Sequence, residues 1–195
     1  MEPIIQATEK VSDAIGECLG IEHQEVVTGK ILVTGGRGVL GYRVALRLLE
    51  AGSPSVRVGF RHSDDECAQG LSKQGAEVVD FCWDDESTFS EALKGVKLIF
   101  CEATPNIEKW STAFPTFLRA CEEADVKYFV KVSFYHSRKT EEPFHKVSLV
   151  KLHCKCDYLL AQSSIPYTIL SASHFMSNQL VQHHVSKFCH LLPSY

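Results

Sequence analysis

The chain has 195 residues, of which 45% are hydrophobic and 23% charged, and its formal net charge is -4. This composition is typical of a globular protein with one domain and a sizeable core, and the negative charge argues against nucleic-acid binding through bulk charge. No apolar run approaches the roughly 18 residues of a membrane-spanning helix, so no membrane association is expected.

Residues 1–28 precede the first predicted strand, and we interpret them as an N-terminal extension. They lack the basic start and apolar block of a secretory signal, and only residues 11–19 show weak helical spacing. The eight cysteines do not fit a disulfide framework, because several fall on predicted helices or strand ends. We therefore expect free thiols and a cytoplasmic location.

From residue 30 onward, apolar strand patterns alternate regularly with helical patterns. In chain order, the predicted strands are 30–34, 55–61, 76–80, 96–101, 128–132 and 167–170. The predicted helices between them are 39–51, 64–74, 86–94, 107–124 and 145–162. Because this alternation implies right-handed crossovers, we predict an α/β fold, a doubly wound parallel sheet covered on both faces. A ligand would then lie across the carboxyl ends of the strands.

The first predicted strand leads directly into a glycine-rich turn and then into a helix. Glycines three residues apart permit a tight turn and let the backbone approach phosphate groups, while the helix N-terminus offers unpaired N–H groups. The strand before, the helix after and the next strand about twenty residues on favour dinucleotide binding over a turn that has lost its ligand. The expected cofactor contacts are Thr34, Gly35, Arg37, Gly38, Val39, Leu40 and Gly41.

The end of the second predicted strand indicates which dinucleotide is bound. An Asp or Glu there would accept hydrogen bonds from the adenosine ribose and favour NAD, but this chain has Arg61. A guanidinium pairs bidentately with a 2′-phosphate, so Arg61 favours NADP and makes NAD the weaker candidate. Arg37 would add a second positive charge. The alternative, two solvated surface arginines, remains open.

Three segments carry a family resemblance: the glycine turn with Arg61, the segment Ala92–Phe100, and a C-terminal block. The C-terminal block is the most specific, and it comprises His153–Leu160, Ser163–Leu170 and Phe175–Asn178. On these segments, residues 30–178 resemble the NmrA-like branch of the atypical short-chain dehydrogenase/reductase superfamily.

The resemblance implies an NADP(H)-preferring Rossmann domain, which we place at residues 29–178. Some members of the family are reductases of quinones or other small carbonyl compounds, so an oxidoreductase is the leading hypothesis. Others bind the dinucleotide with little or no turnover, and the alternative is a redox sensor that acts through a protein partner. Members usually continue into a small substrate subdomain, which would be largely missing here, where only a tail at 179–195 remains.

The resemblance also implies where chemistry would take place. Ser133 lies where the superfamily places a serine near the nicotinamide, although it could merely cap the strand end. His153 stands at a helix position that often holds a lysine, so it would touch the ribose or nicotinamide, or simply pack beside the sheet. Tyr135 and Lys139 have the Tyr-x-x-x-Lys spacing of reductases, but they fall in a polar loop, which favours coincidence.

The chain departs from the family pattern at two places, with Ser171-Ala172 where an Arg-Pro pair is frequent and Cys82 where an Asp is frequent. We expect no metal site. His153, Cys154 and Cys156 do not share one helix face, and the histidines and cysteine of residues 183–190 match no standard ligand spacing.

Overall fold

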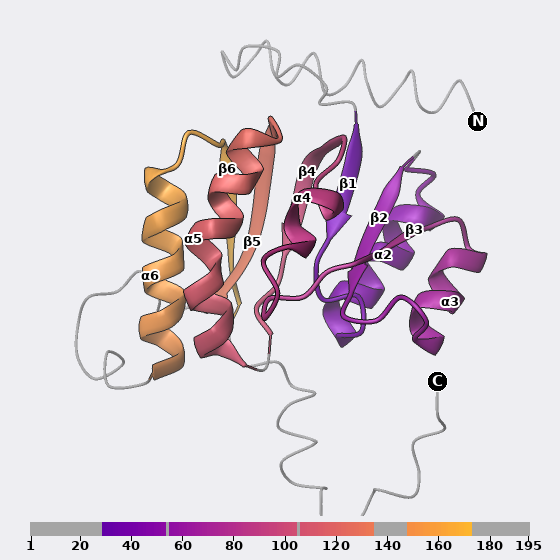
Figure 1. Cartoon of the computed structure of the whole chain (residues 1–195), viewed down its shortest axis with the longest axis horizontal. Helices are drawn as coiled ribbons and strands as arrows, with labels where there is room; N and C mark the ends of the chain where they lie inside the picture. Colours follow the sequence, from indigo (N-terminus) through magenta and orange to yellow (C-terminus); the bar gives the residue numbers. More distant parts are fainter. Residues whose placement is uncertain (1–28, 54, 105, 135–147, 173–195) are drawn as a thin grey trace, which may run out of the picture.

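The computed structural model describes residues 29–53, 55–104, 106–134 and 148–172, which form alternating strands and helices (Figure 1). The strands are β1 (Lys30–Val33), β2 (Val56–Phe60), β3 (Glu77–Asp80), β4 (Val96–Cys101), β5 (Tyr128–Phe134) and β6 (Tyr167–Ala172). The helices are α2 (Val39–Glu50), α3 (Glu66–Lys73), α4 (Thr88–Ala92), α5 (Ile107–Glu123) and α6 (Ser148–Gln162). Within these described ranges, no helix is both long and apolar enough to cross a bilayer.

The six strands form one sheet in the order β3-β2-β1-β4-β5-β6, and every neighbouring pair is parallel. This confirms the predicted doubly wound parallel sheet. The order reverses between β1 and β4, which lie side by side at its centre. Val33 pairs with Phe100, and the Thr34 N–H donates to the Phe100 carbonyl at 2.9 Å. The loops that follow β1 and β4 therefore meet at the carboxyl edge of the sheet.

The predicted boundaries lie within two residues of the observed ones wherever the residues are described. Helix α3 begins at Glu66 because the Asp65 carboxylate accepts the Cys67 N–H at 2.9 Å and caps it. Strand β5 continues through Phe134, beyond the predicted end, because its pairing with β6 extends to Ala172. That extension places Ser133 inside a strand.

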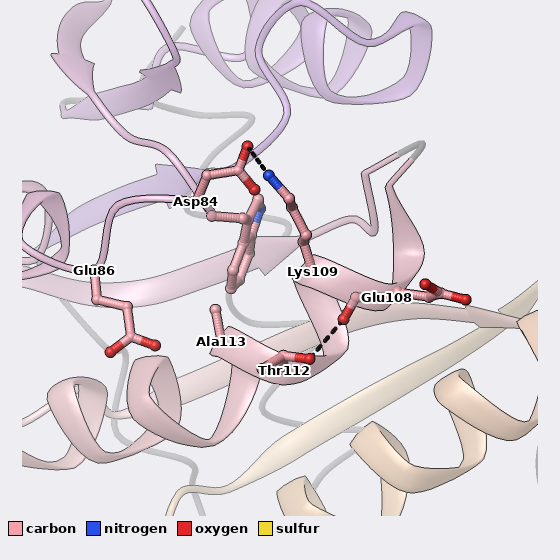
Figure 2. A pocket seen from close by; sticks show the side chains of 7 residues that line it. Asp84, Glu86, Glu108, Lys109, Thr112 and Ala113 are labelled. Atoms are coloured by element: carbon pink, nitrogen blue, oxygen red, sulfur yellow. Dashed lines mark hydrogen bonds and ion pairs between the residues drawn. The ribbon is translucent and has the colours of Figure 1, made fainter.

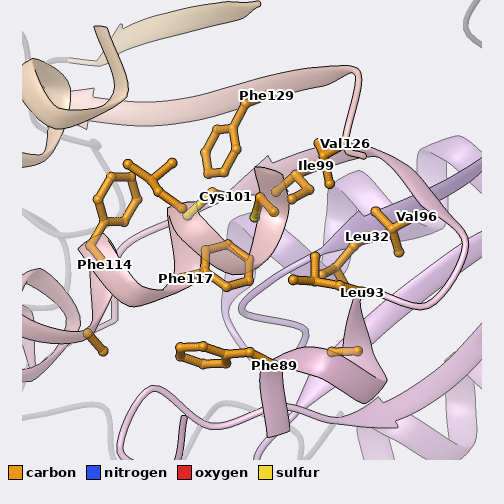
Figure 3. Packing of buried hydrophobic residues seen from close by; sticks show 14 of the residues in the cluster. Leu32, Phe89, Leu93, Val96, Ile99, Cys101, Phe114, Phe117, Val126 and Phe129 are labelled. Atoms are coloured by element: carbon orange, nitrogen blue, oxygen red, sulfur yellow. The ribbon is translucent and has the colours of Figure 1, made fainter. Parts of the chain in front are cut away.

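Two hydrophobic cores cover the two faces of the sheet, because alternate strand residues point to opposite sides. On β1, Leu32 belongs to one core and Val33 to the other. The α5-side core is rich in aromatic rings, and Figure 3 shows how part of it packs between α5, the sheet and α4. Its aromatic residues are Phe81, Trp83, Phe89, Trp110, Phe114, Phe117 and Phe129. The α2-side core is mostly aliphatic, with Phe60 as its one buried aromatic residue among those described: Val33, Ala45, Val56, Val58, Phe60, Ala68, Leu71 and Ala76.

Arg57 is a buried arginine in β2, with only 4% of its surface exposed. Its guanidinium donates to the carbonyls of Glu91, Ala92 and Lys94 at 3.2, 2.8 and 2.9 Å, and it pairs with Glu77 at 2.7 Å. It therefore ties β2 to the C-terminal end of α4 and to β3. Hydrogen bonding to Arg57 is the main reason that the pKa of the Glu77 carboxyl falls to about 2.

Replacing Arg57 by methionine is expected to lower the free energy of unfolding at neutral pH by about 2–3 kcal/mol, because three carbonyls lose their donor. The folded-state pKa of Glu77 lies below its ordinary value of 4.5, so its contribution is present above that pH and is lost as pH falls toward 2. The variant should lose less stability over this acid range. Urea unfolding at neutral and acidic pH measures both effects. The control Arg47→Met removes an exposed pair, and equal losses in the two variants would contradict the role of Arg57.

Candidate functional site

The glycine-rich turn between β1 and α2 is tight and leaves no room for side chains at its glycines. Gly35 has a φ of +73°, and its carbonyl accepts the Gly38 N–H at 2.8 Å. A Cβ added to Gly41 would lie 2.4 Å from the Gly35 carbonyl oxygen and 2.8 Å from that of Thr34. The first turn of α2 thus passes so close to the end of β1 that glycine is required.

The N-terminus of α2 is suited to an anion. Gly38 is its N-cap and supplies no side-chain hydrogen bond, and the first turn holds no acidic residue. Helix geometry leaves the N–H groups of Val39, Leu40 and Gly41 without intrahelical partners, and these groups give the terminus a partial positive charge. The turn therefore fits a pyrophosphate: backbone N–H groups face a cradle that a Cβ at Gly38 would fill.

Glu102 is a carboxylate in this cradle that the sequence analysis missed. It directly follows β4, and its N–H donates to the Thr34 hydroxyl at 3.1 Å. A Cβ on Gly38 would lie 2.7 Å from its Oε1 atom, and a Cβ on Gly35 would lie 3.2 Å from its Cδ atom. Burial raises the pKa of this carboxyl to about 7, while the Gly41 backbone N–H acts in the opposite direction. In the sequence, the signal that could have identified Glu102 is an acidic residue directly after the predicted strand that pairs with β1.

The two arginines proposed for the 2′-phosphate lie on the surface near the same edge. Arg61 directly follows β2, its side chain is 63% exposed, and it pairs with Asp84 at 3.4 Å. Arg37, 80% exposed, pairs with Asp65 at 3.1 Å. Both side chains are accessible to a ligand. To bind one, each arginine would have to leave its present carboxylate partner.

An open groove of about 340 Å³ lies between the loop after β3 and the first turns of α5 (Figure 2). Asp84 and Lys109 form an ion pair of 3.3 Å at its side. The lining residues are Trp83, Asp84, Glu86, Glu108, Lys109, Thr112 and Ala113. Because carboxylates outnumber the one lysine, the groove does not suit a phosphate group.

The buried polar cluster consists of Lys131 and Ser133 from β5 with His153 and Asp157 from α6. All four residues are buried, and the most exposed of them, His153, has only 7% of its surface accessible. One carboxylate oxygen of Asp157 accepts from Lys131 Nζ and the other from the Ser133 hydroxyl, each at 2.7 Å. Lys131 Nζ also lies 3.4 Å from His153 Nδ1 and 5.1 Å from the centre of the Trp110 ring. Lys131 and Ser133 are two residues apart on β5, so both side chains point to the same face of the sheet and reach Asp157.

His153 is neutral at physiological pH in this setting. Burial, and then the charge of Lys131, lower its pKa to about 4, against the opposing effect of Asp157. Because an ammonium only donates, we assign Nδ1 as the acceptor and place the ring proton on Nε2. The structure therefore brings both candidate catalytic residues, Ser133 and His153, into one cluster. Asp157 joins them because it lies four residues beyond His153 on the same helix face, a signal the sequence offered.

Several sequence candidates lie elsewhere. Tyr135, Lys139 and the cluster at 183–190 fall outside the described residues. Cys82 lies in the turn after β3, where its N–H donates to the Thr88 hydroxyl at 3.1 Å. The pair Ser171-Ala172 belongs to β6, beside the end of β5.

A protein-family model described as the NmrA-like family matches residues 27–191. Among curated proteins, a (4-alkanoyl-5-oxo-2,5-dihydrofuran-3-yl)methyl phosphate reductase of Streptomyces griseus is 30% identical over 150 residues, which cover 77% of this chain and 49% of the relative. Quinone oxidoreductase 2 of Escherichia coli is 26% identical over 150 residues, covering 77% and 50%.

Among solved structures, the NADPH complex of an NADPH-dependent quinone oxidoreductase from Escherichia coli superposes with a TM-score of 0.67 at 25% identity. The match covers 78% of this chain and 52% of that one. The chain thus spans about half the length of the curated relatives it matches.

Proposed function

Because the chain belongs to the NmrA-like family, we propose that it is an NADP(H)-binding oxidoreductase that reduces a small quinone or another carbonyl compound. The observation that carries the proposal is the glycine turn at the point where the strand order reverses, with an α2 N-terminus whose N-cap residue, Gly38, supplies no side-chain hydrogen bond. The relatives named as reductases, one of them solved with NADPH, support it.

In this proposal, the backbone of Gly35, Gly38 and Gly41 cradles the pyrophosphate, and Arg61 with Arg37 binds the 2′-phosphate. NADPH, when bound, supplies the hydride. Ser133 would orient a substrate carbonyl at the carboxyl end of β5 by turning its hydroxyl proton from Asp157 to the carbonyl oxygen. The positive charge of Lys131, which shares Asp157 with Ser133, would favour negative charge developing on the carbonyl oxygen.

Replacing Arg61 by alanine is expected to weaken NADPH binding about 10- to 100-fold, which corresponds to the loss of charge-assisted hydrogen bonds to a phosphate. NADH lacks the 2′-phosphate, so its affinity should change less than about twofold. Calorimetric titration with both cofactors measures this difference. The matched control is Arg43→Ala, an exposed arginine on α2. Equal weakening of both cofactors by Arg61→Ala would show that Arg61 does not read the 2′-phosphate.

A second candidate is a dinucleotide-responsive regulator that acts through a protein partner. The neutral state of His153 favours it, because that side chain holds no readily donated proton at physiological pH. Steady oxidation of NADPH with a panel of quinones would support the enzyme. Binding without turnover, together with a change in affinity for a captured partner, would support the regulator.

The six described cysteines are all free thiols, which supports the proposed cytoplasmic location.

A further inference from the structure

We propose that Glu102 competes with the dinucleotide for the pyrophosphate cradle, so that binding is favoured by protonation of Glu102 and takes up a proton. The inference rests on the proposed function and adds a regulation of the same site. It assigns to this carboxyl a role in setting cofactor affinity, distinct from any contact with the reacting atoms.

The geometry places the carboxylate where a phosphate would bind. Its Oε1 atom lies over Gly38, its Cδ and Cγ atoms lie over Gly35, and the Gly41 N–H at the first turn of α2 faces it. The Oε2 atom is buried and has no hydrogen-bond partner among the described residues. An ionised carboxylate here supplies the negative charge that the helix terminus attracts, and it repels a second anion.

In the described part of the chain, Glu102 has no cationic partner, because the surrounding cations pair with other carboxylates. From the glycine turn, Arg37 pairs with Asp65 instead. On β5, Lys131 pairs with Asp157. Cys101, the residue before Glu102, has a buried thiol. The first turn of α5 carries Glu108 and Lys109, and Lys109 pairs with Asp84.

The protonation state of Glu102 is consequently poised near neutrality. Burial raises its pKa to about 7, and an incoming phosphate would raise it further because like charges disfavour ionisation. If the dinucleotide binds only the protonated form, the apparent dissociation constant rises about tenfold when the pH is one unit above the pKa.

The test compares NADP+ binding to the protein and to Glu102→Gln at pH 6 and pH 8. Glutamine keeps the size of the side chain, so the variant removes the charge and retains the bulk. We expect the variant to bind about tenfold more tightly than the parent at pH 8 and nearly equally at pH 6. The 2′-phosphate of the ligand titrates equally in both proteins, so its effect cancels in the ratio of the parent's dissociation constant to the variant's. The control Glu123→Gln changes the same charge at an exposed position at the far end of α5 and should leave the ratio at one.

A second measurement needs no ligand. The folded-state pKa of Glu102 lies above its ordinary value of 4.5, so its ionisation costs stability as pH rises from 4.5 through about 7. Glu102→Gln should therefore raise Tm by several degrees at pH 8 and by much less at pH 5. Equal Tm differences at the two pH values would overturn the inference.

The outcomes separate the two proposals. Measurable binding with parallel pH profiles in the parent and Glu102→Gln overturns the competition by Glu102 and leaves the proposed function standing. Absence of NADP+ binding in every variant at both pH values overturns the proposed function itself, and the competition with it. Calorimetry in buffers of different ionisation enthalpy counts the protons directly: on binding, the parent should take up about half a proton more than the variant at pH 7 and nearly one more at pH 8.

Discussion

Replacing Asp157 by alanine is expected to lower the free energy of unfolding by about 3–5 kcal/mol at neutral pH, because it leaves a buried ammonium without its carboxylate. Lys131 has no exposed surface, and its 2.7 Å contact with Asp157 is its ion pair in the described structure. The Ser133 hydroxyl loses an acceptor in the same substitution. Urea unfolding followed by circular dichroism measures the loss.

The double variant Lys131→Met/Asp157→Leu tests the cause of that loss. Removing both charges replaces an ion pair by apolar groups of similar volume, which is often neutral or stabilising in a buried setting. We therefore expect the double variant to recover most of the stability that either single substitution removes. Ser133→Ala is the matched control and should cost about 1.5–3 kcal/mol, the value of one hydrogen bond to a charged group. Additive losses in the double variant would contradict the assignment of Lys131 and Asp157 as a coupled pair.

Replacing Gly41 by alanine is expected to destabilise the protein by about 3 kcal/mol, at the upper end of the cost of overpacking, and to abolish measurable NADP+ binding. The new methyl group would lie 2.4 Å from the Gly35 carbonyl oxygen, which is backbone and cannot rotate away. The first turn of α2 must then move off β1, and the N–H groups of the cradle move with it. Thermal unfolding and calorimetric titration measure the two effects.

Gly70 provides the matched control for this prediction. It also lies inside a helix, α3, but a Cβ there would meet only the Tyr42 hydroxyl, at 3.8 Å. Alanine at both positions gains the same helix propensity, so Gly70→Ala should stabilise the protein by about 0.5–1 kcal/mol. If the two variants behaved alike, the close approach of α2 to β1 would not be the reason for glycine at position 41.

The fold could be predicted from the sequence because its signals are local. Each strand is a short apolar run between turn residues, and each helix has its own apolar face, so alternation alone indicates the parallel sheet. The glycine turn was recognisable for the same reason, since Gly35, Gly38 and Gly41 lie within seven residues of one another.

The residues that sequence reasoning missed act through contacts between distant segments. Glu102 enters the cradle because β4 pairs with β1, and its hydrogen bond to Thr34 spans 68 positions. Strand periodicity is also misleading at Arg57. In a strand with one exposed face, an arginine side chain is expected to point toward water. β2 is an interior strand of this sheet and both of its faces are covered, so the guanidinium is buried and donates to three carbonyls and Glu77.

Both tryptophans of the chain, Trp83 and Trp110, belong to the α5-side core, with ring centres 6.1 Å apart. Tryptophan fluorescence therefore reports on the α5-side core and is insensitive to changes in the α2-side core. Loosening of α2, as in Gly41→Ala, would register in far-ultraviolet dichroism before it altered the emission spectrum, whereas damage at Asp157, whose partner Lys131 contacts the Trp110 ring, would change the emission at once. If far-ultraviolet dichroism and tryptophan fluorescence give the same unfolding curve, the two sides of the sheet unfold as one cooperative unit. If the curves differ, the α2 side and the α5 side unfold separately.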